Sequence, residues 1–378
     1  MSDNVELRVV VQNTSDAGGT FLTPFYFGFT DEKFDLFDVG GEASAGLESL
    51  AEDGAFATLA AERLAVDADS QALVVTGDAG PIVAGEFTES TIMVDATSNN
   101  FVSFAAMILP SNDAFIGTDD AIQLFNSQGQ FLGEQTIVFE GTDVYDAGTE
   151  VNTELDAAFI NQAAPNTGED ENGVIRQHEG FNGSLGNPEG EGDQIILGGT
   201  NAFGVEIDPV AADFTQPDAQ IAEVHINTVA RHEGTDGRDR ITGGNDDDLV
   251  NAGDGDDRIN TGNGWDVVDA GAGDDRITAG RGTDIVIGGE GDDDVRLGEG
   301  DDYFVFRSGD GDDLLRDFNG PGDDTIHLII EGVDSFEDVA AAAQDSRGGT
   351  LLDFGDAGSI FLQGVDADSL TSDDFFFG

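Results

Sequence analysis

The stretch that decides the fold runs from Gly234 to Val305 and reads GTDGRDRIT GGNDDDLVN AGDGDDRIN TGNGWDVVD AGAGDDRIT AGRGTDIVI GGEGDDDVR LGEGDDYFV. Its period is nine residues, and eight copies follow one another without a gap. The sixth place of every copy is Asp, and the eighth is apolar. Glycine holds the second and fourth places except at Thr235 and Asp246. Such strict register indicates one structural unit repeated along an axis.

Each place of the repeat has a mechanical reason. Two glycines in a short turn permit positive φ and direct backbone carbonyls toward one point, to which the Asp adds carboxylate oxygens. About six to eight hard oxygen ligands in a flexible arrangement suit calcium better than zinc or magnesium. The last three residues form a short strand whose middle, apolar side chain points inward. The repeat therefore predicts calcium sites in its turns and an apolar interior between its strands.

This pattern resembles the nonapeptide G-G-x-G-x-D-x-U-x of RTX, or hemolysin-type, calcium-binding proteins. The resemblance implies a parallel β-roll in which each copy is a half-turn, copies n and n+2 stack, and an ion lies between their turns. Four turns on each edge leave three gaps, so about six internal sites are expected, with the end sites open. The expected ligands alternate between the two edges: Asp239, Asp257, Asp275 and Asp293 on one, and Asp248, Asp266, Asp284 and Asp302 on the other. Beyond Val305 the period loosens by two-residue insertions, and Asp313 and Asp324 continue the ligand series.

An acidic, glycine-rich disordered tail is the alternative interpretation of the same stretch. The two interpretations agree in part, because without calcium the carboxylates repel one another and the strands bury too little surface to become ordered. Metal binding is then expected to be the folding reaction itself.

The outward places of the repeat differ between odd and even copies. In the odd copies the seventh place reads Arg240, Arg258, Arg276 and Asp294, which indicates a solvated face. In the even copies an apolar stripe is expected, formed by Leu249, Val267, Ile285 and Tyr303, with Ile287 and Val305 added from the ninth place. Exposed apolar patches mark contacts. We therefore expect the stripe to be covered by the C-terminal segment, the N-terminal domain or, less simply, a partner protein.

Composition limits the partners of the chain. Its 378 residues carry 78 acids against 14 bases, for a formal charge of −64. Nucleic acid and anionic membranes are unfavourable partners for such a chain, whereas cations are favourable ones. Without any specific function, the acidity is explained by solubility or by adaptation to a saline habitat. Without cysteine, neither disulfides nor thiolate zinc sites can stabilise the fold.

The ends of the chain bear on where the protein acts: without an N-terminal signal it would be expected in the cytosol, but the calcium repeats favour export by a route that needs no such signal. The start MSDNVELRVVVQN lacks a basic region followed by an apolar one, and no apolar run is long enough for a transmembrane segment. The end DSLTSDDFFFG resembles the uncleaved C-terminal signal of substrates of type I secretion machinery, although a buried last strand at Phe375 to Phe377 explains it equally well. Between them, Ser335 and Asp338 predict a capped short helix, and TLLDF and SIFLQ predict a hairpin.

The N-terminal part predicts an antiparallel β-sandwich. Strand-like runs such as ELRVVVQN, FVSFAAMIL and AEVHINTV alternate with turns, and SAGLESLAEDG and AFATLAAERLA form a short helical insertion. GGTFLTPFYFGF, FDLFDVGGEASAGLE, MILPSNDAFIGTDD and DVYDAGTEVNTE resemble the spondin N-terminal domain in its bacterial form. That resemblance implies one calcium ion bound by Asp113, Asp146 and Glu150, and an extracellular matrix or adhesion role by analogy.

The expected organisation is all-β: a spondin-like sandwich over residues 1–229, a linker at 230–233, the roll at 234–329 and a C-terminal cap at 330–378. No catalytic residue is predicted, because the four histidines form no H-E-x-x-H motif and NGSLG departs from G-x-S-x-G at Asn182. We expect a secreted bacterial protein, extracellular or at the cell surface, that folds on calcium and binds a glycan or protein. The alternative is a secreted hydrolase that uses the roll as an export and folding module.

Overall fold

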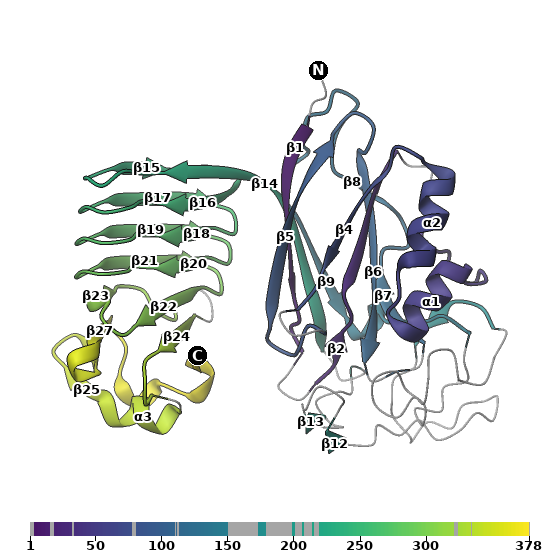
Figure 1. Ribbon diagram of the computed structural model, residues 1–378. Coiled ribbons are helices and arrows are strands. Elements are labelled where there is room, and N and C mark those ends of the chain that lie inside the picture. The colour runs from purple at the N-terminus through teal and green to yellow at the C-terminus, as the bar shows by residue number, and fades with distance from the viewer. Residues whose placement is uncertain are drawn as a thin grey trace. The chain divides into compact units, whose positions relative to one another are not determined.

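The structure is a computed structural model of the chain (Figure 1). It divides into two compact units, Met1–Ile226 and Asn227–Gly378, and each is treated by itself. The described residues are 4–15, 19–31, 34–77, 81–109, 111, 113–149, 173–178, 199–200, 206–207, 214, 219–320, 324–333 and 335–377.

The first unit is a β-sandwich, as predicted. One sheet contains β5 (Phe87–Asp95), β1 (Asn4–Gln12), the first half of β14 (Gln220–Glu233) and β9 (Gln135–Glu140). The second has the order β11 (Arg176–Gln177), β10 (Tyr145–Asp146), β7 (Ala114–Gly117), β6 (Phe101–Leu109), β3 (Phe25–Thr30) and β4 (Gln71–Val75), with β2 (Phe21–Leu22) and β8 (Ile122–Gln123) also paired to β6. A separate pair joins β12 (Gly199–Thr200) to β13 (Glu206–Ile207).

Strand β3 is buried on both faces because the sandwich core lies on one side and the two helices lie on the other (Figure 1). Phe25, Phe27 and Phe29 belong to the core between the sheets, whereas Tyr26 packs with helices α1 (Ala45–Asp53) and α2 (Ala57–Val66). Ser44 is the N-cap of helix α1, and its hydroxyl accepts the Leu47 N–H at 3.1 Å. The helical insertion is confirmed, and it shields the outer face of the second sheet.

The second unit is a parallel β-roll with two facing sheets, which confirms the predicted architecture. The odd sheet, named after the odd copies, contains β15 (Arg240–Thr242), β17 (Arg258–Asn263), β19 (Arg276–Arg281), β21 (Asp294–Glu299), β23 (Gly311–Leu315), β27 (Gly358–Gln363), β26 (Gly349–Asp353) and β25 (Ala343–Ser346). The even sheet contains the second half of β14, β16 (Asp247–Asn251), β18 (Val267–Asp269), β20 (Ile285–Ile287), β22 (Tyr303–Arg307), β24 (Thr325–Ile329) and β28 (Phe375–Phe377).

Successive coils stack in register at a separation of 18 residues. Ile241 pairs with Ile259, and Val250 pairs with Val268. The eighth-place side chains are all buried in one apolar stack: Ile241, Val250, Ile259, Val268, Ile277, Val286, Val295 and Phe304. Residues 230–233, expected as a linker, lie at the end of β14, where they pair in parallel with β16.

The glycine places are fixed by the close approach of one coil to the next. Gly291 has a φ of 140°, and a Cβ there would lie 2.1 Å from the carbonyl oxygen of Gly273. Thr235 and Asp246 replace glycine in the first coil, where no earlier repeat turn approaches. A Cβ at the neighbouring Gly237 would meet no atom within 4 Å. The two exceptions to the repeat therefore fall where the steric demand is absent.

The C-terminal cap extends both sheets of the roll. Strand β27 pairs in parallel with β23 and forms the predicted hairpin with β26, and β28 pairs in parallel with β24. Helix α3 (Phe336–Ala342) follows Ser335, but no side-chain capping bond forms at that N-cap. The predicted cap is wrong in this respect, because the Ser335 hydroxyl donates to the Asp338 carboxylate at 2.7 Å instead.

The outer stripe of the even sheet is half-buried at Leu249, Val267 and Ile285. Strand β28 does not lie across this stripe. It continues the sheet as the next strand, with Phe376 61% exposed. The C-terminal segment is therefore not the cover that the sequence suggested.

Candidate metal centre

The repeat aspartates form two ladders, one along each edge of the roll. Within each ladder, Oδ1 of one Asp accepts the backbone N–H of the ladder Asp one coil earlier. The donor–acceptor distances lie between 2.6 and 3.2 Å. One ladder contains Asp239, Asp257, Asp275, Asp293 and Asp313. The other contains Asp248, Asp266, Asp284, Asp302 and Asp324. The insertions before Asp313 and Asp324 lengthen the turns without breaking either ladder.

The second carboxylate oxygen divides the ladder aspartates into two groups. In seven aspartates Oδ2 is buried without a hydrogen-bond partner: Asp257, Asp266, Asp275, Asp284, Asp293, Asp302 and Asp313. A buried oxygen without a partner costs free energy comparable to a lost hydrogen bond, and a buried negative charge costs more. Seven such oxygens at repeated places require a compensating group.

The pKa values of six of these carboxyls are raised, which also indicates that their negative charge lacks compensation. Burial, reinforced by neighbouring carboxylates, raises the pKa to about 6 for Asp266, about 7 for Asp275, Asp293 and Asp302, and about 8 for Asp313. It also raises the pKa of Asp284 well above its usual range. A cation beside Oδ2 removes the cause, because it favours the charged form of each group.

In the three remaining ladder aspartates, Oδ2 accepts a hydrogen bond from another group of the protein. Oδ2 of Asp239 accepts the N–H and the hydroxyl of Thr235, both at 2.7 Å. Oδ2 of Asp248 accepts the Gly244 N–H, and its Oδ1 lies 2.6 Å from His232 Nε2. Oδ2 of Asp324 accepts the Asn319 N–H at 2.7 Å. These predicted ligands lie at three of the four ladder ends and differ from the other seven aspartates.

His232 was missed by the sequence interpretation, which began the repeat at Gly234. A register count would have revealed it, because His232 pairs with Val250 and so takes the place of an inward side chain in a partial copy before the first. At Oδ1 of Asp248, the His232 side chain takes the place of the backbone N–H that the later aspartates of the same ladder accept.

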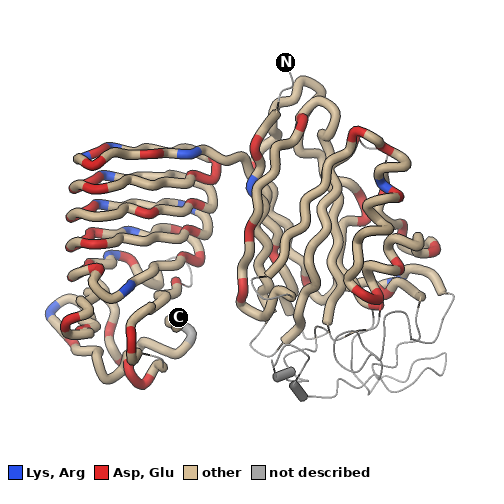
Figure 2. Tube along the Cα trace, in the orientation of Figure 1, with Lys and Arg blue, Asp and Glu red and all other residues tan. Residues whose placement is uncertain are grey.

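The donor set at the two edges suits calcium. Carboxylate oxygens recur at each coil beside the glycine turns, and acidic residues gather there along the whole roll (Figure 2). Calcium accepts about six to eight oxygen ligands in flexible geometry, which carboxylates and turn carbonyls together can supply. Zinc sites depend on nitrogen or sulfur ligands, which the inner rungs lack.

Comparison with known proteins gives two matches to family models. Residues 26–173 match Spondin_N, and residues 233–268, 260–295, 269–304 and 278–315 match the RTX calcium-binding nonapeptide repeat. The chain carries a Spondin_N domain followed by RTX repeats. The RTX repeats bind Ca²⁺, and several ions belong to the roll.

Other comparisons add little to this assignment. No curated protein matches the chain. The crystal structure of extracellular lipase LipA from Serratia marcescens is similar over 39% of this chain and 40% of that one, with 18% identity and a TM-score of 0.23. The match thus spans less than half of the lipase, and a TM-score this low supports no inference about activity.

The Spondin_N domain places two of its three expected calcium ligands on neighbouring segments of backbone, since the Ala147 N–H donates to the Asp113 carbonyl at 3.1 Å. Asp113 is fully buried, and its carboxylate accepts the Thr149 N–H at 3.1 Å. Asp146 lies on β10 opposite Ala114, and its Oδ2 is 3.1 Å from Nη2 of Arg176. Glu150 lies outside the described residues. Arg176, which the sequence did not single out, already compensates Asp146, so calcium at this second site stays a prediction.

The surroundings of this pair contain a neutral histidine. Burial lowers the pKa of His178 to about 4. Its ring packs edge-on against Phe214, with 5.3 Å between the ring centroids. Within the described ranges, in this domain and in the roll alike, no three His, Asp or Glu side chains form a cluster that could hold a metal ion, so backbone carbonyls must complete any calcium site there.

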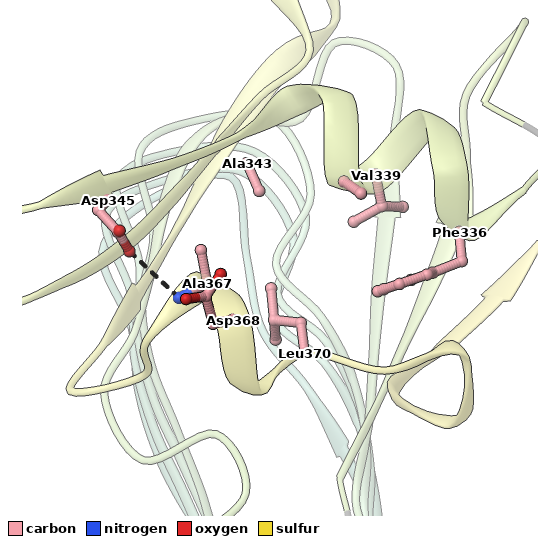
Figure 3. Close-up of a pocket in the computed structure, with 8 residues that line it drawn as sticks. Phe336, Val339, Ala343, Asp345, Ala367, Asp368 and Leu370 are labelled. Carbon is pink, nitrogen blue, oxygen red and sulfur yellow. Dashed lines mark hydrogen bonds between the residues drawn. The ribbon is translucent and has the colours of Figure 1, made fainter.

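A pocket of about 300 Å³ lies in the C-terminal cap (Figure 3). Phe336, Val339 and Leu370 form its apolar side, and Asp345 accepts the Ala367 N–H at 3.2 Å on the other. None of its lining residues is Ser, Cys or His. This pocket therefore supplies no nucleophile with an adjacent base.

No helix in the part of the chain that the structure describes is long and apolar enough to cross a membrane.

Proposed function

We propose that the protein is secreted and that its RTX roll folds when it meets calcium outside the cell. The observation that carries the proposal is the set of seven buried Oδ2 atoms without a hydrogen-bond partner. Calcium beside these atoms would convert the greatest liability of the roll into its main source of stability, since binding free energy then becomes folding free energy.

The calcium gradient across the cell envelope makes this a switch. Sites of extracellular affinity bind with dissociation constants of about 0.1 to 1 mM and stay empty at cytosolic calcium. With empty sites, the ladder carboxylates repel one another and must be buried without compensation. The roll is then unfolded before export and ordered after it. An unfolded chain can pass through the narrow channel of a secretion machinery.

The C-terminal segment fits the same sequence of events. Phe375 belongs to the apolar core of the roll, because β28 is the last strand of the even sheet. A secretion signal at this place would be exposed while the roll is unfolded and buried once the roll has folded. We infer that type I machinery reads it before calcium arrives.

Limited proteolysis tests the switch. We expect the full chain to lose residues of the second unit quickly in chelator and to resist cleavage there in about 5 mM calcium. Magnesium at the same concentration should give little protection, because it demands near-octahedral geometry. Equal protection by both ions, or protection in chelator, would contradict the proposal.

The Spondin_N domain is proposed to bind an extracellular glycan or protein and to give the molecule an adhesion or matrix role. This rests on the domain match and on the analogy with extracellular members of that family. Binding of the calcium-loaded chain to an array of glycans, with Asp113→Asn as the variant, tests it. The hydrolase alternative draws no support from the two pockets found in the cap, because neither has a His or Cys among its lining residues.

A further inference from the structure

The outer face of the odd sheet carries a row of arginines in direct register. Arg240 pairs with Arg258, and Arg258 pairs with Arg276, on the adjacent strands β15, β17 and β19. All three side chains are exposed. Beside them runs a second row formed by Thr242, Asn260 and Thr278. No Asp or Glu takes an outward place on these three strands, although acids outnumber bases by 78 to 14 in the chain.

Such a row is unfavourable unless something compensates it. Adjacent strands lie about 4.8 Å apart, and like charges directly opposite each other destabilise a sheet. The next strand shows how the fold neutralises a row. Asp294 pairs with Arg276 at 3.0 Å and also with Arg316. In the part of the chain that the structure describes, no carboxylate lies within ion-pair distance of Arg240 or Arg258.

From this geometry we propose that the arginine row Arg240, Arg258 and Arg276, chiefly through its uncompensated members Arg240 and Arg258, binds a linear acidic polysaccharide with a carboxylate or sulfate group on its sugars. The guanidinium groups repeat about every 4.8 Å along the axis of the roll, so they match charges repeated along an extended polymer. The planar guanidinium fork binds carboxylate and sulfate oxygens in pairs. Hydroxyl and amide groups of the neighbouring row offer hydrogen bonds to sugar hydroxyls.

Two other polyanionic surfaces fit the face less well. Single-stranded nucleic acid is bound through aromatic side chains that stack on the bases, and the outward places of β15, β17 and β19 contain none. An anionic membrane favours apolar side chains beside the basic ones, whereas the outward places of β15, β17 and β19 have none. The overall charge of −64 does not prevent local binding, because charges beyond about 8 Å are screened at physiological salt.

Calcium and polysaccharide binding are coupled through the fold. The proposal rests on the proposed function, since the row exists only when successive coils stack in register. Asp257 and Asp275 immediately precede Arg258 and Arg276 in the chain, so calcium at their carboxylates also adds positive charge beside the row. Acidic turn residues flank the row, but Arg238 already pairs with Asp256 at 2.5 Å.

The test uses the full chain in saturating calcium with sulfated dextran, polygalacturonate, uncharged dextran and a single-stranded DNA oligonucleotide as probes. Binding is measured by surface plasmon resonance in about 0.15 M salt. The variant Arg240→Gln with Arg258→Gln removes two members of the row. The control Arg307→Gln with Arg347→Gln removes the same charge from exposed places elsewhere in this unit. Circular dichroism establishes beforehand that every variant folds with calcium.

We expect the wild type and the control to bind one or both acidic polysaccharides, and the row variant to bind about tenfold more weakly. The better of the two polymers identifies carboxylate or sulfate as the group recognised. Equal binding by the row variant, no binding to either acidic polymer, or stronger binding to DNA would overturn the proposal. A roll that folds with calcium but fails these tests refutes the polysaccharide site alone. A roll that does not respond to calcium refutes the proposed function.

Discussion

The backbone N–H of Asp275 donates to Oδ1 of Asp293 at 2.8 Å, while Oδ2 of the same Asp293 is buried without a hydrogen-bond partner. One oxygen of the carboxylate thus holds two coils in register, and the other is left for a cation. The same two roles of Oδ1 and Oδ2 recur on both edges of the roll. They link the stacking of the coils to calcium binding.

Replacing one inner ladder Asp should weaken both calcium binding and folding. Asp275→Asn keeps an oxygen for the backbone bond but removes the negative charge, so the calcium concentration at half-folding should rise by about tenfold or more. Asp269→Asn, an exposed acid on β18, removes the same charge and should leave that concentration nearly unchanged. A calcium titration monitored by calorimetry measures the midpoint concentration of both variants. Equal midpoints for the two would contradict the ligand assignment.

Acid should favour the metal-free roll. The folded pKa values of Asp275 and Asp293, about 7, lie above the ordinary value of 3.8 because of burial. Each group therefore contributes stability that is fully present below about pH 4 and is lost as the pH rises through about 7. In chelator, circular dichroism should show more ordered roll at pH 5 than at pH 8. More order at pH 8 would show that the ladder carboxyls are not buried in the metal-free fold.

The glycine turns should be intolerant only where coils touch. Gly291→Ala places a methyl group 2.1 Å from a backbone oxygen at a φ of 140°, so it should destabilise the roll by about 2 kcal/mol or more. Gly237→Ala is the matched control, because its Cβ meets open space. Thermal unfolding in calcium measures both. Equal unfolding temperatures would contradict the close stacking of the coils.

The half-buried stripe of the even sheet should resist charge. Val267→Lys with Ile285→Lys should lower the unfolding temperature, because each change removes a half-buried apolar side chain whose burial contributes about 1 kcal/mol. Thr242→Lys with Asn260→Lys adds the same charge on the odd sheet and controls for the reduced net charge. If both doubles unfold alike, the stripe contributes no stabilising contact.

The period of nine led to the resemblance to RTX repeats, and that resemblance implied the roll, its 18-residue register and the division of the aspartates between two edges. Local rules for glycine, aspartate and strand alternation explain why each place of the repeat suits that fold. The sequence interpretation did not reach two relationships that the fold makes, one at the end of a ladder and one in the Spondin_N domain. His232 approaches Asp248 only because β14 continues into the even sheet, and Arg176 reaches Asp146 from β11. Of the covers expected for the apolar stripe, the C-terminal segment was wrong, because β28 pairs with the open edge of β24 instead.

The most direct test of the central claim is circular dichroism of the full chain during a calcium titration that starts in chelator. We predict a cooperative gain of β-structure, confined to the RTX roll and superimposed on a constant signal from the Spondin_N domain. Magnesium should not produce it, and added chelator should reverse it. A spectrum that changes with neither calcium nor chelator would contradict calcium-driven folding.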